Sequence, residues 1–126
     1  TTSAVSFCLY PLSRHEAVQQ KLFEELRMHY GQDLFRGVIL SDFATLPYLS
    51  CVVKESLRLY PPIPAVARCL EKDLVIDEGY IPVGTNVVVL LWQLLRDEAI
   101  FTDPLVFQPE RHLGEEAPRL SPYSYI

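Results

Sequence analysis

Apolar residues recur with helical spacing in the first half of the chain. From Arg14 to about Tyr30 they return every three or four positions, which is typical of an amphipathic helix. Gly31 is suited to end this helix. Upstream, residues 6–9 fit the end of an earlier helix that Pro11 stops or kinks. The apolar face of the longer helix comprises Val18, Leu22, Leu26 and, more loosely, Phe23, while its wet side holds Gln19, Gln20, Lys21, Glu24, Glu25 and Arg27.

A second helix is predicted from Pro47 to about Leu59. Proline is well placed in a first helical turn, where its missing N–H costs no hydrogen bond. Pro61 and Pro62 end the helix, because a residue that precedes proline is pushed out of the helical region. Its crowded side comprises Leu49, Val52, Val53 and Ser56.

The second half of the chain is rich in proline and is predicted to be short strands and coil. Eight of the ten prolines lie at or after Pro61. The pattern therefore predicts a mainly α chain with small β-sheets, helices in the first half and strands and coil in the second. The expected elements are strands at residues 65–69, 74–76 and 86–91, turns at 77–79 and 82–84, a short helix at 92–96, and a long ordered coil from 101.

Composition and charge exclude several classes of protein. The chain has 126 residues, about one domain's worth, and a net charge of −5, which excludes an ordinary basic nucleic-acid binder. A hydrophobic content of 49% argues against disorder. The longest apolar run, Val87 to Trp92, is far shorter than the ~20 residues of a membrane-spanning helix. No transmembrane helix is expected.

The three cysteines, Cys8, Cys51 and Cys69, lack the spacing of metal ligands. We expect buried, reduced thiols rather than a disulfide framework or a zinc site, and no metal ligand in this chain.

Glu55 and Arg58 lie three positions apart on the second predicted helix, so their side chains meet on one face. Considered by itself, such a pair is usually an exposed ion pair worth less than ~1 kcal/mol. Here it lies near the helix end among apolar residues, and Arg111 follows in the coil. One carboxylate that bridges both guanidinium groups would tie the coil to the helix.

Four segments, in this order, resemble motifs of the cytochrome P-450 monooxygenases. Residues 9–10, 14–15 and 61–68 are more specifically similar to the family-four branch, the fatty-acid hydroxylases. The four segments are Thr1-Thr2-Ser3 (the end of the oxygen-activating motif of the I helix), residues 54–62 (the E-x-x-R motif of the K helix), residues 79–85 (a strand and turn), and Arg96-Asp97, Asp103-Pro104 and Pro109-Glu110-Arg111 (the meander).

The resemblance covers residues 1–126 and implies a partial cytochrome P-450 domain rather than a complete one. It would contain the C-terminal end of the I helix, the J and K helices, small β-sheets and the meander. The cysteine thiolate that ligates the haem iron would follow Ile126, in the pattern F-x-x-G-x-R-x-C. Cys8, Cys51 and Cys69 lack that context. We therefore expect an internal fragment that is inactive by itself, with both ends cut.

The resemblance also implies roles for individual residues. Glu55, Arg58 and Arg111 would form a structural triad that fixes the meander and the haem pocket. Arg68 would pair with a haem propionate, for which a planar guanidinium is suited. Thr1 would be the catalytic alcohol that helps to deliver protons to iron-bound oxygen.

A segment of four residues would line the substrate pocket above the haem, where an apolar surface suits an alkyl chain. The alternative for this segment is ordinary strand core. The four residues are Ile63, Pro64, Ala65 and Val66.

Several positions depart from the family pattern. His112 stands where phenylalanine usually follows Pro-Glu-Arg, and Glu98 stands where proline is common; both are expected to loosen the meander. Pro11 occupies a normally helical position, and Glu16 replaces a usual proline. His15 and His29 are expected on helix surfaces.

The function that the resemblance implies is insertion of one oxygen atom from O2 into a fatty acid or another lipophilic substrate. Haem would be the cofactor, and NADPH would supply electrons through a flavoprotein, the NADPH-cytochrome reductase. The parent protein would lie on the cytosolic face of the endoplasmic reticulum membrane, held by an N-terminal anchor outside this chain.

Two alternatives remain from the residues themselves. The chain could be a haem-free small scaffold or interaction module, although residues 61–67 and 87–92 would then need covering surfaces. A serine or cysteine hydrolase has less support, because no nucleophile, histidine and acid stand out together.

Overall fold

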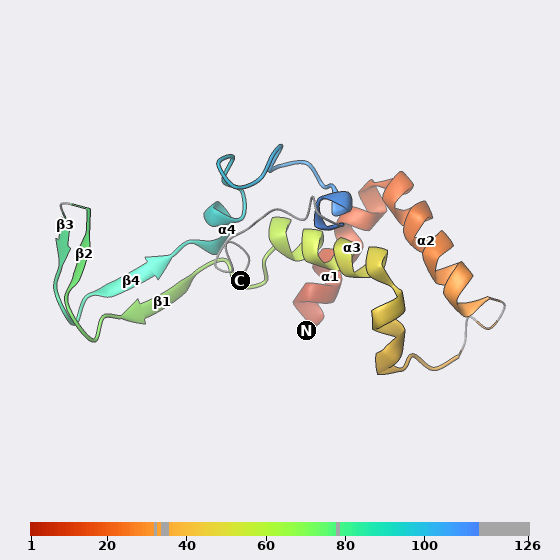
Figure 1. Ribbon diagram of the computed structural model, residues 1–126, viewed down its shortest axis with the longest axis horizontal. Coiled ribbons are helices and arrows are strands. Elements are labelled where there is room, and N and C mark those ends of the chain that lie inside the picture. Colours follow the sequence, from red (N-terminus) through yellow and green to blue (C-terminus); the bar gives the residue numbers. More distant parts are fainter. Residues whose placement is uncertain (32, 34–35, 78, 114–126) are drawn as a thin grey trace.

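A helical body carries a long β-ribbon that extends from one side (Figure 1). The computed structural model describes residues 1–31, 33, 36–77 and 79–113. The described helices are α1 (Thr2–Arg14), α2 (Glu16–Tyr30), η1 (Leu40–Thr45), α3 (Pro47–Leu59), α4 (Leu91–Leu94) and η2 (Pro109–His112), where η denotes a 3-10 helix. The mainly α fold with small antiparallel sheets confirms the predicted fold class.

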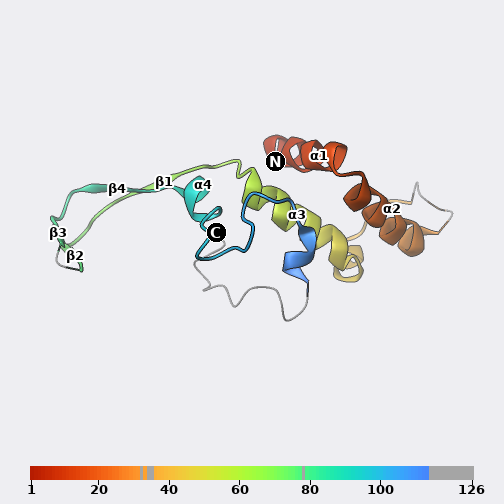
Figure 2. The ribbon, with the colours of Figure 1, turned by 90° about the horizontal axis from the view of Figure 1, so that it is seen from above.

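Pro11 lies inside α1 and does not stop it. The helix continues to Arg14, although proline cannot donate the usual backbone hydrogen bond. The Pro11 ring is buried, and its carbonyl accepts a hydrogen bond from the N–H of His15 at 3.0 Å. The chain changes direction between α1 and α2 (Figure 2), and His15 is the residue between them, so α2 begins at Glu16 rather than at Arg14. Burial of the ring outweighs the local signal that predicted a stop or a kink at Pro11.

The predicted apolar face of α2 forms part of the main core. Leu22 is buried, and Val18 and Leu26 pack against the same cluster. Phe23 is 49% exposed and does not belong to this face. The core also contains Tyr48, Val52, Leu59 and Phe107.

α3 has the predicted bounds, and it lies at the centre of the helical body (Figure 1). Val52 and Ser56 are buried as expected, whereas Val53 is exposed. Two core residues that the expected apolar side omitted, Tyr48 and Cys51, are also buried on this helix.

Glu25, which was expected on the wet side of α2, caps the N-terminus of α3. Its two carboxylate oxygens accept hydrogen bonds from the backbone N–H groups of Tyr48 (2.7 Å) and Leu49 (2.8 Å). These N–H groups lie in the first helical turn and have no partner within the helix. A negative charge at the N-terminus of a helix also interacts favourably with the helix dipole.

Replacement of Glu25 by alanine is therefore expected to destabilise the packing of α2 on α3. Loss of a cap costs about 1 kcal/mol, and two N–H groups lose their acceptor here. The measurement is the urea midpoint of the full-length protein, which should fall for Glu25→Ala. Glu24→Ala, which removes an exposed carboxylate from the same helix, is the matched control and should leave the midpoint nearly unchanged. Equal midpoints for the two variants would refute the cap.

The β-ribbon consists of two short antiparallel pairs. β1 (Val66–Cys69) pairs with β4 (Asn86–Val89), and β2 (Leu74–Ile76) pairs with β3 (Gly79–Ile81) at the far end. β3 was not among the three strands that the hydrophobic pattern predicted, because Gly79 was assigned to a turn, but it begins the segment 79–85 in which the family resemblance implied a strand and a turn. Leu91 was expected in the last strand but begins α4 instead.

Between residues 101 and 113 the coil contains one short helix, η2, that the sequence did not predict. Phe101 is buried with Leu91 and Leu95 in a second, smaller core that joins α4 to this coil. The part of the predicted coil beyond residue 113 lies outside the described residues.

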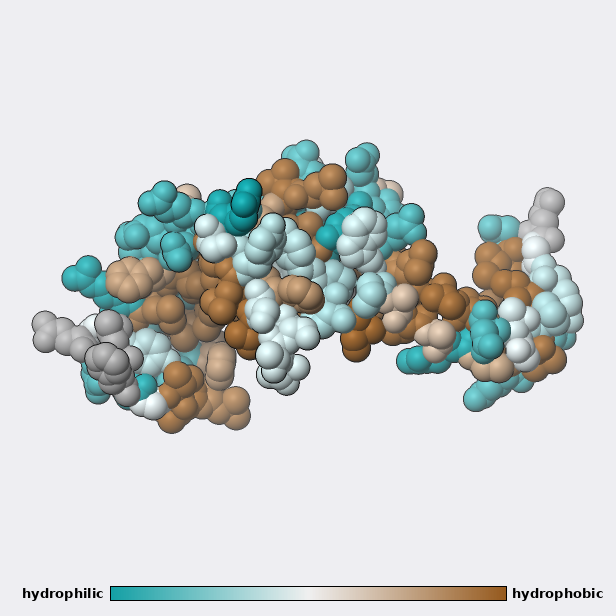
Figure 3. Space-filling model, turned by 180° about the vertical axis from the view of Figure 1, so that it is seen from behind, coloured by the Kyte–Doolittle hydropathy of each residue, from teal (hydrophilic) through white to brown (hydrophobic). Residues whose placement is uncertain are grey.

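Apolar side chains are exposed along the ribbon and at its junction with the body (Figure 3). Ile63 is 62% exposed and Val88 is 55% exposed, so the two segments that were expected to need covering surfaces are only partly covered. This exposure is unfavourable for a self-contained scaffold. Cys69 is also exposed, so the expectation of a buried thiol is wrong there, whereas Cys51 is buried and Cys8 is half-buried. Among the described residues no helix is long and apolar enough to cross a membrane.

Candidate functional site

A fully buried carboxylate, that of Glu55, lies where α3, η2 and the preceding coil meet. Its oxygen Oε1 accepts hydrogen bonds from Arg58 Nη2 (2.9 Å), Gln108 N (3.0 Å) and Arg111 Nε (2.9 Å). Its oxygen Oε2 accepts from Arg58 Nε (2.9 Å) and His112 Nε2 (2.9 Å). Glu55 thus joins α3 to the coil, because its carboxylate accepts hydrogen bonds from side chains and from a backbone N–H of the coil and η2.

Arg58 is also fully buried, and hydrogen bonds occupy its whole guanidinium group. Two bonds form the bidentate pair with Glu55, one helical turn away. Nη1 donates to the backbone carbonyls of Leu95 and Pro104, each at 2.7 Å, and Nη2 donates to that of Val106 at 3.4 Å. The guanidinium carbon lies 4.9 Å from the ring centroid of Phe101.

Arg111 binds the coil as well as Glu55. Its Nη1 donates to the carbonyl of Thr102 at 2.8 Å, and its Nη2 donates to those of Asp103 (3.3 Å) and Val106 (3.2 Å). Asp103 has a φ of +47°, a conformation that costs energy for a residue with a side chain. Arg58 and Arg111 therefore satisfy backbone carbonyls that an irregular coil could not pair by itself.

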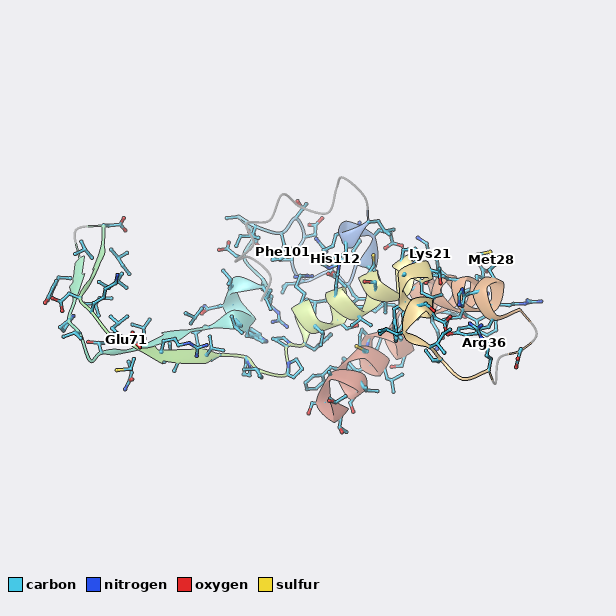
Figure 4. The ribbon with its side chains drawn as sticks, turned by 60° about the horizontal axis from the view of Figure 1, so that its bottom comes forward. Lys21, Met28, Arg36, Glu71, Phe101 and His112 are labelled. Atoms are coloured by element: carbon cyan, nitrogen blue, oxygen red, sulfur yellow. The ribbon has the colours of Figure 1, made fainter. Side chains whose placement is uncertain are left out.

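His112 does not loosen the coil as expected. It follows Arg111 directly in η2 and reaches the other oxygen of the same carboxylate, with its side chain only 7% exposed (labelled in Figure 4). Sequence reasoning missed this contact, because the family pattern suggested an apolar residue at that position.

The hydrogen bonds set the ionisation of Glu55. Burial raises the pKa of a carboxyl group, but the bonds from Arg58, His112 and the Gln108 N–H outweigh it and lower the pKa of Glu55 to about 2. The ionised form is therefore the folded-state form at neutral pH.

This lowered pKa predicts a pH dependence of stability. The stabilisation is complete above pH 4.5, the usual pKa of the group, and is lost as the pH falls towards 2. It amounts to about 3 kcal/mol. The urea midpoints of the wild type and of Glu55→Gln in the full-length protein should therefore differ most near neutral pH and converge in acid. A difference that does not change with pH would contradict this assignment.

An apolar pocket of about 510 Å³ lies between α1, the end of α3 and the start of the ribbon. Ile63 and Val66, two of the four predicted substrate-contacting residues, line it. Pro64 and Ala65 do not, and the Pro64 carbonyl instead accepts a hydrogen bond from the N–H of Trp92 at 3.0 Å. The lining residues are Ala4, Leu57, Pro61, Pro62, Ile63, Val66, Leu91 and Leu95.

Thr1 and Arg68 are each close in sequence to a residue that lines this pocket, but neither lines it. The Thr1 carbonyl accepts the hydrogen bond from the N–H of Val5 at 3.0 Å, so Thr1 begins the helical turn that carries the pocket residue Ala4. Arg68 follows Val66 by two positions in β1, and residues two apart on a strand project from the same face. Its side chain is exposed, with Nη1 donating to the Ala67 carbonyl at 2.8 Å.

A second buried carboxylate, Asp42 in η1, was not predicted. It accepts hydrogen bonds from His29 Nε2 (3.0 Å), Arg36 Nη2 (2.8 Å), the Tyr30 hydroxyl (3.3 Å) and the Ile39 N–H (2.9 Å). The Ile39 N–H makes the largest contribution to lowering the pKa of Asp42, against the effect of burial. His29 is thus a half-buried partner of Asp42 and not simply a surface residue, whereas His15 is exposed as expected.

The Asp42 cluster places the Thr45 hydroxyl 3.2 Å from His29 Nδ1, which superficially matches a nucleophile, histidine and acid. However, the Thr45 hydroxyl donates to the backbone carbonyl of Asp42 at 2.8 Å. A hydroxyl that donates its proton there is not set up to transfer it to a histidine. The cluster is better explained as the connection that holds η1 against α2. Nothing in the described part of the chain groups three or more histidine, cysteine or acidic residues as metal ligands.

Comparison with known proteins agrees with the motifs. All 126 residues match the family model described as cytochrome P-450. The chain is 99% identical over its whole length to cytochrome P-450 4ae1 of Drosophila melanogaster, and it covers 25% of that protein. It is 45% identical to cytochrome P-450 4d2 of the same organism (25% covered) and 39% identical to cytochrome P-450 4V2 of Rattus norvegicus (24% covered).

The chain therefore spans about a quarter of the length of the curated relatives that it matches. The names of these relatives agree with the predicted similarity to the family-four branch. The match over the whole chain shows that it belongs to the cytochrome P-450 family.

Proposed function

We propose that the chain is an internal segment of a haem-thiolate monooxygenase. In this proposal α1 is the end of the I helix, α2 is the J helix, α3 is the K helix, and the coil with η2 is the meander. The observation that carries the proposal is the buried Glu55 carboxylate, which binds Arg58 and Arg111 and so holds the coil against α3 beside an apolar pocket.

The residues around the pocket fit haem. Haem has a large apolar ring, and the pocket has an apolar lining. Haem also has two carboxylates at one edge, and the exposed Arg68 lies two residues beyond the pocket residue Val66. Arg68 would hold a propionate through its planar guanidinium. When bound, the haem iron supplies the activation of O2. The thiolate ligand would come from outside this chain, since burial raises the pKa of the Cys51 thiol and neither Cys8 nor Cys69 lines the pocket.

The other pocket residues would bind and orient the substrate. Ile63 and Val66, together with Leu57 from α3, form an apolar wall that excludes water and favours an alkyl chain. Pro64 and Ala65 would complete this segment once the rest of the protein covers it. The Thr1 hydroxyl, at the start of α1, would hold and transfer a proton. The triad of Glu55, Arg58 and Arg111 would act at a distance, by fixing these elements.

The finer assignments follow from the family-four similarity and are part of the proposal. The substrate would be a fatty acid or a related lipophile, and one atom of O2 would enter one of its C–H bonds. Electrons would come from NADPH through a flavoprotein reductase. The whole protein would be a membrane protein of the endoplasmic reticulum that faces the cytosol.

The test uses the full-length protein, purified with its haem. Its reduced, carbon monoxide-bound absorbance spectrum should show thiolate ligation. With NADPH, the reductase and a fatty acid under ¹⁸O2, mass spectrometry should find a hydroxylated product with one labelled oxygen. A full-length protein without haem would refute the monooxygenase. Haem binding without oxygenation of fatty acids would refute only the substrate class.

A further inference from the structure

The side chain of His112 is placed as a hydrogen-bond donor to Glu55. Its Nε2 lies 2.9 Å from Glu55 Oε2. An ionised carboxylate can only accept hydrogen bonds, and the pKa of Glu55 is lowered to about 2, so His112 must donate from Nε2. A neutral imidazole with its proton on Nε2 is sufficient for this bond.

The two oxygens of Glu55 differ in how much they depend on His112. Oε1 has three donors, from Arg58, Gln108 and Arg111. Among the described residues, only Arg58 and His112 donate to Oε2. Without His112, this fully buried oxygen would keep one donor from the described part of the chain, and a buried charged group that loses a partner is costly.

His112 and Arg111 together give η2 two points of attachment on one carboxylate. Arg111 binds Oε1 and His112 binds Oε2, and both come from the same short helix. η2 is also held through Glu110, which accepts hydrogen bonds from the Tyr48 hydroxyl (3.0 Å) and from Lys21 Nζ (2.7 Å), and the two bonds to different oxygens of Glu55 add to that attachment in fixing its orientation. The orientation of η2 in turn sets where Arg111 meets the carbonyls of Thr102, Asp103 and Val106.

We propose that His112 is a positioning residue, a fourth member of the Glu55 cluster that fixes η2 and Arg111 and so helps the full-length protein to retain haem. Its effect on haem rests on the proposed function. Its effect on the attachment of η2 does not, because that follows from the contacts in this chain alone.

The test compares two substitutions in the haem-loaded, full-length protein. His112→Phe keeps an aromatic ring, and it introduces the residue that usually follows Pro-Glu-Arg in the family, but it removes the donor. His112→Gln removes the ring but keeps an amide N–H the same number of bonds from the backbone as Nε2. His15→Phe is the matched control. It makes the same change of residue type at a histidine that packs on Phe107, a residue of the main core, with ring centroids 5.0 Å apart.

The rate of haem transfer to excess apomyoglobin is expected to rise roughly tenfold or more in His112→Phe. In His112→Gln the rate should stay within about threefold of the wild type, since Gln restores the donor. In His15→Phe it should also stay within about threefold, since that substitution leaves the donors to Glu55 in place. Slow transfer in His112→Phe would overturn the proposal. Equally fast transfer in His112→Gln would also overturn it, because ring packing would then be the cause.

A second measurement keeps the inference separate from the proposed function. If the wild type carries no haem, the monooxygenase proposal fails, and the urea midpoints of the same variants are compared instead. His112→Phe should then unfold at lower urea than the wild type, with His112→Gln close to the wild type. Any other order would overturn the role of His112 itself.

Discussion

Replacement of Arg58 by alanine is expected to abolish haem incorporation into the full-length protein. The substitution removes both hydrogen bonds of the ion pair with Glu55 and leaves the carbonyls of Leu95, Pro104 and Val106 without this donor. Removal of one partner from a buried ion pair costs about 3–5 kcal/mol, which is a large part of the stability of a typical domain. The absorbance spectrum of the purified protein measures the result.

Two further substitutions separate the charge of Arg58 from its geometry. Arg58→Lys keeps the charge but cannot form the bidentate pair and reach the carbonyls at the same time, so a partial loss of haem is expected. Arg27→Ala removes an exposed arginine from α2 and should leave haem content unchanged. A normal haem spectrum in Arg58→Ala would show that the cluster does not support the haem pocket.

The features that could be predicted from the sequence are those set by neighbours along the chain. The bounds of α3 follow from Pro47 at its start and Pro61 after its end, and both are local effects. The contact between Glu55 and Arg58 follows from helical spacing. The apolar face of α2 also has a clear period, and Leu22 is buried as that period predicts.

The features that could not be predicted depend on segments far apart in the sequence. Proline ends many helices, but the Pro11 ring is buried in the folded body, and no local sequence pattern indicates that burial. Glu25 has the spacing of a surface residue, yet α3 supplies the N–H groups that it binds. Asp42 finds its partners on α2 and at Arg36 only after the chain has turned back.

The candidate site shows the same division. Arg111 could be linked to Glu55 from its charge and from the family motif, but His112 could not, because the motif has an apolar residue there. The expectation that His112 loosens the coil was wrong. It rested on the apolar residue in the motif, whereas His112 donates a hydrogen bond to Oε2 of Glu55. The roles of Thr1 and Arg68 stay predictions, since their proposed partners lie outside the chain.

Replacement of Arg68 by leucine is expected to weaken haem retention about 10- to 100-fold without disturbing the fold. A charge-assisted hydrogen bond to a carboxylate contributes about 1.5–3 kcal/mol, which corresponds to this range. The side chain is exposed, and its only hydrogen bond within the described residues goes to the adjacent Ala67 carbonyl. The urea midpoint of the protein without haem should therefore be unchanged. Haem transfer to apomyoglobin measures the retention.

Arg68→Lys should fall between the wild type and the leucine variant, because lysine keeps the charge but not the planar pair of donors. Lys72→Leu, which removes an exposed cation from the same ribbon, is the matched control and should retain haem normally. Wild-type retention in Arg68→Leu would remove the propionate assignment. A fall in the urea midpoint of the haem-free protein would instead show that Arg68, like Arg58, stabilises the fold. A residue that only binds haem can affect stability only while haem is present.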